Sequence, residues 1–143
     1  QASITGLSAD ALLRFYTTAV RPILEYGCVV WHHGLTQAQS DRLESLQKRA
    51  LRIIFDNLVI DMPYQFALSL SKITTLSDRR TSLGKSFFKK ICQPGACLHN
   101  LLPPPRDPDL LARLRHPNVY PIPINHVNHY CSFLSYALAH YQN

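Results

Sequence analysis

The sequence of 143 residues is poor in cysteine and in acidic residues, and it has no long apolar run. Its four cysteines, Cys28, Cys92, Cys97 and Cys131, are too few and too dispersed for the disulfide framework of a small secreted domain. No apolar stretch approaches the roughly 20 residues that cross a bilayer, and no signal-peptide pattern follows Gln1. We therefore expect a fragment of a longer intracellular protein, nuclear or cytoplasmic, with no membrane partner.

The scarcity of acidic residues leaves the chain basic. Nine Asp and Glu stand against 15 Lys and Arg, which gives a formal net charge of +6. A basic domain of this size favours a polyanionic partner such as RNA or DNA, although an ordinary basic surface is the alternative. No Gly-x-Ser-x-Gly elbow and no phosphate-cradling glycine loop occurs. We therefore predict no catalytic residue in this chain.

Apolar residues recur at three- and four-residue spacing, which predicts an all-α fold. The expected architecture is a small bundle of about three main helices with a Pro-rich irregular tail and a short terminal helix. Ser8 is the expected N-cap of the first helix, and Pro22 is expected to kink or break it. The element should end near His33-Gly34. Its predicted apolar stripe is Leu12, Phe15, Tyr16, Ala19, Ile23, Tyr26 and Val30.

Two capping boxes, Thr36 with Gln39 and Thr75 with Asp78, predict the other main helices. Arg80 falls within the apolar arc of the second of these helices. Because a buried unpaired guanidinium is costly, we expect Arg80 to snorkel or to meet a carboxylate from another helix. The expected buried stripes are Leu43, Leu46, Ala50 and Ile53 on the first helix, and Leu76, Leu83, Phe87 and Ile91 on the second.

Proline gathers in the last third of the chain. Residues 94–125 hold eight of the ten prolines, which predicts an extended segment with one short helix through Leu110–Leu114. Ser132 should cap a terminal helix. We therefore expect a helical domain over residues 1–93 and a Pro-rich tail over residues 94–143.

The basic side chains of the two later main helices fall largely outside the predicted apolar stripes. Long cations on a rigid helix can contact phosphates without reading bases, whereas the alternative is a solvated helix face. Glu44 and Lys48 form a favourable i,i+4 pair. The candidate nucleic-acid-binding residues are Lys48, Arg49 and Arg52 on one helix, and Arg79, Lys85, Lys89 and Lys90 on the other.

Two further patterns have competing interpretations. Aromatic side chains at Tyr16, Tyr26 and Trp31 could stack on bases, but the spacing of the two tyrosines favours packing in the core. Cys92, Cys97 and His99 could bind zinc, with a further ligand from His116, His126, His129 or Cys131. Structural zinc usually takes two close-spaced ligand pairs, so a cysteine packed at a helix end is favoured and no metal is predicted.

Four signatures occur in order along the chain and together resemble one family. The chain is similar to the thumb and post-thumb region of reverse transcriptases from LINE-type (non-LTR) retrotransposons. The signatures are Tyr16 with Arg21-Pro22, Leu24-Glu25-Tyr26 and Trp31; Leu46-Gln47-Lys48-Arg49-Ala50 with Ile53; Leu76 with Arg79-Arg80; and Leu101-Leu102-Pro103, Arg113-Leu114-Arg115, Tyr120-Pro121, Ser132-Phe133 and Tyr136-Ala137-Leu138.

The resemblance implies a thumb-like domain over residues 1–93 that binds the RNA/DNA primer–template hybrid, with the palm domain of the same polypeptide as its partner. The parent would be an RNA-directed DNA polymerase that uses Mg²⁺. No Asp-Asp pair is present to hold Mg²⁺, so this fragment itself is not expected to be an enzyme and needs no cofactor. The alternative is a helical protein-interaction module or an inactive retroelement remnant that does not bind nucleic acid.

A second departure from the family lies near the C-terminus. The run Asn125-His126-Val127-Asn128-His129 is neutral where relatives tend to be basic. Phosphate contacts are therefore expected from the helices and not from this part of the tail.

Overall fold

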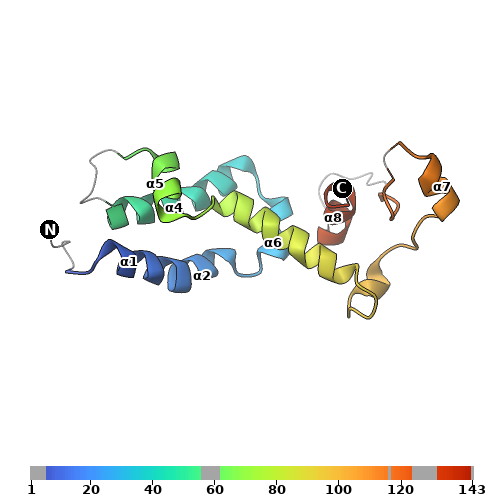
Figure 1. The fold of residues 1–143 in the computed structure, drawn as a ribbon, viewed down its shortest axis with the longest axis horizontal. Coiled ribbons are helices and arrows are strands. Elements are labelled where there is room, and N and C mark those ends of the chain that lie inside the picture. The colour runs from blue at the N-terminus through green and yellow to red at the C-terminus, as the bar shows by residue number, and fades with distance from the viewer. Residues whose placement is uncertain (1–5, 56–61, 116, 124–131, 143) are drawn as a thin grey trace. The chain divides into compact units, whose positions relative to one another are not determined.

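The computed structural model describes residues 6–55, 62–115, 117–123 and 132–142. These residues form helices joined by loops, with no strand among them, which confirms the predicted all-α fold (Figure 1). Short π- and 3₁₀-helical segments occur at Tyr16–Val20, His32–Gly34 and His99–Leu101. The α-helices are α1 (Ala9–Phe15), α2 (Arg21–Glu25), α3 (Cys28–Trp31), α4 (Gln37–Phe55), α5 (Tyr64–Ser71), α6 (Leu76–Ile91), α7 (Pro108–Arg113) and α8 (Phe133–His140).

The chain divides into two compact units. The first comprises residues 1–28 and 35–80, and the second comprises residues 29–34 and 81–143. The boundary expected from the sequence, between residues 93 and 94, lies inside the second unit. Each unit has its own apolar cluster, so each is described by itself.

Four helices begin behind the side-chain caps that the sequence predicted. In each, the cap oxygen accepts a hydrogen bond from the backbone N–H three residues on, which satisfies a donor that a helix start leaves unpaired. Gln39 Oε1 also accepts the N–H of Thr36 at 2.9 Å, which completes a capping box. The cap distances are 3.2 Å for Ser8, 3.3 Å for Thr36, 3.0 Å for Thr75 and 3.3 Å for Ser132.

A π-helical segment, Tyr16–Val20, joins α1 to α2 directly before Pro22. The N–H of Arg21 donates to the carbonyl of Tyr16, five residues back. A π turn holds more residues than an α turn, so the residues after it are rotated away from their places on an α-helical wheel.

This rotation explains why part of the first predicted stripe is wrong. Tyr16 is buried as predicted, whereas Phe15 is 63% exposed and Ile23 is 76% exposed. Ala19 is exposed as well. The helix then stops at Gly27, whose φ of 62° is left-handed, and Tyr26 is 84% exposed instead of packed.

The core of the first unit lies between the π segment, α4 and α5. Its buried members are Tyr16, Leu51, Ile54, Phe55, Ala67 and Leu68. On α4 the predicted stripe is rotated, because Leu46 and Ile53 are exposed while the neighbours Gln47 and Ile54 are buried. A polar residue at the centre of the buried side is what misled the hydrophobic pattern. Pro63 precedes α5, which carries Tyr64, Ala67 and Leu68 as predicted.

In the second unit, the end of α6 packs against α8. Phe88, Ala137 and Leu138 form the buried cluster, with Phe133 and Tyr141 packed against it. Ile91 is buried as predicted, while Leu83 and Phe87 are only half-buried. A Cβ on Gly84 would lie 3.0 Å from the hydroxyl oxygen of Tyr141, so the glycine permits this close approach.

Candidate nucleic-acid interface

Three predicted phosphate-binding residues of the first unit, Lys48, Arg49 and Arg52, lie on the exposed side of α4. They fall within about one helical turn, or roughly 6 Å along the helix axis. Within the described part of the chain, none of the three takes part in an ion pair. Their charges are therefore available to a ligand from solution.

The predicted ion pair between Glu44 and Lys48 does not form in this structure. The carboxylate of Glu44 points inward, where its Oε2 accepts the N–H of Leu76 at 3.0 Å. A carboxylate at this position favours the start of α6, because the N-terminus of a helix carries partial positive charge. Lys48 instead places its Nζ 5.1 Å from the centre of the Tyr64 ring.

Tyr64 is held between α4 and α5 by its hydroxyl. Its Oη donates to Glu44 Oε1 and accepts a hydrogen bond of 2.9 Å from Gln47 Nε2. Burial raises the pKa of Tyr64, and the hydrogen bond to Glu44 raises it further. The ring that faces Lys48 is therefore a neutral phenol with a fixed position.

Gln47 is the polar centre of this core. Its Oε1 accepts a hydrogen bond of 2.8 Å from Tyr16 Oη, and its Nε2 also donates to the carbonyl of Thr74 at 3.0 Å. Burial raises the pKa of Tyr16 to about 12. Tyr16 is thus a packed core residue, as its spacing predicted, and its face is closed to base stacking.

Arg80 confirms its predicted place on the buried side of α6. It is fully buried in the first unit, and its Nη2 donates to Ser40 Oγ at 2.9 Å. Burial lowers the pKa of Arg80, and the negative charge of Glu44 partly offsets this effect. Arg80 therefore joins α6 to α4 and is not a candidate for phosphate binding.

Arg79, also in the first unit, is exposed but already paired. Its Nε lies 3.3 Å from Glu25 Oε1, and the same carboxylate pairs with Arg21 at 2.9 Å. A phosphate would have to compete with Glu25 for this guanidinium. Arg79 is the weakest phosphate candidate of the predicted set.

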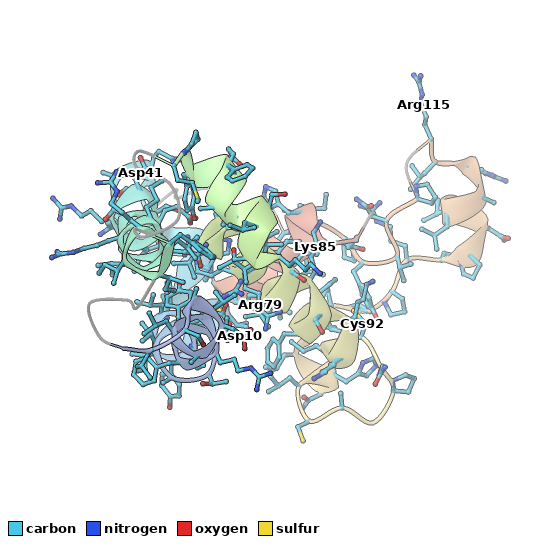
Figure 2. All side chains as sticks on the ribbon, turned by 60° about the vertical axis from the view of Figure 1, so that its left-hand side comes forward. Asp10, Asp41, Arg79, Lys85, Cys92 and Arg115 are labelled. Atoms are coloured by element: carbon cyan, nitrogen blue, oxygen red, sulfur yellow. The ribbon has the colours of Figure 1, made fainter. Side chains whose placement is uncertain are left out.

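In the second unit, Lys85, Lys89 and Lys90 are exposed along α6. Figure 2 marks Arg79 and Lys85 on this helix. Lys85 and Lys89 are one turn apart and share a side of α6. Lys89 and Lys90 also occupy the last turn, where positive charge stabilises the C-terminus of a helix. They therefore have a structural role besides the predicted one.

The zinc hypothesis finds no support in the described residues, where no three His, Cys, Asp or Glu side chains are grouped to hold a metal ion. Burial raises the pKa of the Cys92 thiol, and His99 Nδ1 is 3.0 Å from the carbonyl of Ile91. The other proposed ligands, His116, His126, His129 and Cys131, lie outside the described residues, as does the neutral run of residues 125–129.

Sequence reasoning missed the part that Gln47, Glu44 and Tyr64 play beneath the basic side of α4. Gln47 belongs to one of the family-like signatures, but no spacing rule connects it to Tyr64, which lies 17 residues further along. Their contact depends on how α5 packs against α4. Among the described residues, no helix combines the length and the apolar character that crossing a membrane requires.

Comparisons with known proteins return nothing that resembles this chain: no protein-family model, no curated protein and no solved structure matches it.

Proposed function

We propose that this chain is a non-catalytic, thumb-like part of a retrotransposon reverse transcriptase and that it binds the RNA/DNA primer–template hybrid. The observation that carries the proposal is the group of exposed, unpaired cations Lys48, Arg49 and Arg52 on α4. The four family-like signatures and the net charge of +6 support it. Mg²⁺ would belong to the palm of the parent polymerase and not to these residues.

The chemistry expected of this surface is electrostatic. Cations on one side of a rigid helix contact phosphates of any sequence, and each contact releases counterions from the nucleic acid. A thumb requires such sequence-tolerant contacts, because it has to hold every register of the hybrid as synthesis proceeds. Lys85, Lys89 and Lys90 form the corresponding set on the second unit.

A helical protein-interaction module is the second candidate, and a different observation favours it. Phe15, Ile23 and Tyr26 are largely exposed on the first unit. Large exposed apolar side chains are typical of surfaces that another protein covers. In the proposed parent enzyme the palm would be that protein, so the two functions are compatible.

The proposal is tested by fluorescence anisotropy of the whole chain with a short RNA/DNA hybrid at two salt concentrations. We expect micromolar binding and a slope of log K against log salt of about −3 or steeper, because each phosphate contact contributes about −0.9. Replacing Lys48, Arg49 and Arg52 by alanine should make the slope shallower by two to three contacts' worth, at about −0.9 each.

The matched control removes three positive charges from exposed arginines outside the predicted set, Arg14, Arg113 and Arg115. This variant should retain most of the affinity and most of the slope. An absence of binding by the folded wild-type chain at low salt would overturn the proposal. Equal losses in both variants would assign the binding to net charge and would remove the assigned site.

A further inference from the structure

We propose that Tyr64 is a positioning residue for Lys48, whose ammonium group it holds on the outer side of α4 for contact with a phosphate of the nucleic acid. This inference rests on the proposed function. It adds a residue that neither the charge pattern nor the family-like signatures indicate, and it gives Lys48 a different role from Arg49 and Arg52.

The first argument is the geometry of the contact. Lys48 Nζ lies 5.1 Å from the centre of the Tyr64 ring, within the range of about 6 Å at which an ammonium is attracted to a ring face. The ring engages the cation without acting as a lone-pair acceptor. The ammonium therefore keeps N–H donors that can point toward a phosphate oxygen.

The second argument is that the ring itself is fixed. The hydroxyl of Tyr64 donates to Glu44 and accepts from Gln47, and Gln47 is fully buried. Because Glu44 is occupied by Tyr64 and by the N–H of Leu76, its carboxylate does not pair with Lys48. The same arrangement thus supplies a support for Lys48 and removes its nearest competitor for phosphate.

The third argument concerns entropy. A free lysine side chain loses much rotamer freedom when it is ordered on a ligand, and restricting it beforehand lowers that cost. In the described part of the chain, no ring lies under the charged group of Arg52. Lys48 is therefore expected to depend on Tyr64, whereas Arg52 is not.

The test is a double-mutant cycle on the whole chain, read by anisotropy with the RNA/DNA hybrid at fixed low salt. Tyr64→Leu should weaken binding about two- to fivefold, which is the size of an exposed cation–π contact. The same substitution should have no effect when Lys48 is already Gln, and its full effect when Arg52 is Gln. Tyr64→Phe keeps the ring and should restore most of the affinity.

These outcomes separate the inference from the proposed function. If the wild-type chain binds the hybrid but Tyr64→Leu weakens binding equally in all backgrounds, Tyr64 has only a structural role and the inference fails while the proposed function stands. If the wild-type chain does not bind, both fail. Circular dichroism confirms that each variant is folded.

A second measurement covers the case in which Tyr64→Leu does not fold. In the wild-type chain, NMR should show the ε-methylene protons of Lys48 shifted upfield by the ring current of Tyr64, with Arg52 side-chain protons as the reference. Unshifted Lys48 protons would overturn the inference without any substitution.

Discussion

At the scale of single residues, the first unit is organised by polar side chains that its sequence pattern placed elsewhere. Gln47 joins the hydroxyls of Tyr16 and Tyr64 to the carbonyl of Thr74. A buried polar group is tolerated when its hydrogen bonds are made and is costly when they are not. The substitution of any member therefore affects partners on other segments.

Tyr16 gives this network a measurable pH dependence. Its folded-state pKa of about 12 lies above the ordinary value of 10.0, mainly because burial disfavours the phenolate. The stabilisation is fully present below pH 10 and is lost as the pH rises toward 12, by about 3 kcal/mol in total. Urea unfolding between pH 9 and about 12 should show this loss.

The control for this prediction is the exposed residue Tyr26. Tyr16→Phe should remove a large part of the alkaline loss of stability, whereas Tyr26→Phe should leave it as in the wild-type chain. Parallel curves for the wild-type and Tyr16→Phe chains would show that the network does not depend on the Tyr16 proton.

At the scale of helices, α4 provides a direct test of which side is buried. Ile53 and Ile54 are adjacent and chemically identical, yet Ile53 is 60% exposed and Ile54 is 7% exposed. Ile54→Ala should lower the free energy of unfolding by about 2–4 kcal/mol, because it leaves a cavity in the core. Ile53→Ala should change it by no more than about 0.5 kcal/mol. Urea denaturation followed by circular dichroism measures both, and equal effects would contradict the observed orientation of α4.

The same helices show what sequence could and could not predict. Caps are local, because a side chain reaches only three residues along the chain, so Ser8, Thr36 and Thr75 marked helix starts correctly. The buried side of α4 depends on partners from other segments that satisfy Gln47. No local pattern reports such partners, so the predicted stripe was rotated.

The candidate site follows the same rule. The exposure of Lys48, Arg49 and Arg52 could be predicted, since charged side chains on a helix face outward unless they are paired. The pairing of Arg79 with Glu25 joins residues 54 apart, and the support of Lys48 by Tyr64 crosses between two helices. Both required the fold.

At the scale of the whole molecule, the two units have separate apolar clusters with no shared member. Local stability should therefore differ between them. Leu138→Ala opens a cavity in the cluster of the second unit, and hydrogen exchange followed by mass spectrometry should show lost protection in α8. Protection in α5, which belongs to the first unit, should stay unchanged. An equal loss in α5 would show that the chain unfolds as one cooperative body.

The π segment Tyr16–Val20 has a consequence for how this chain could vary. A π turn of this kind contains one residue more than the α-helix around it, so it behaves as an insertion that the helix has absorbed. Deleting one residue such as Thr18 would let α1 and α2 wind as one α-helix and would turn all that follows by about 100°. A single lost codon would then exchange the inner and outer faces of α2 while leaving its composition untouched.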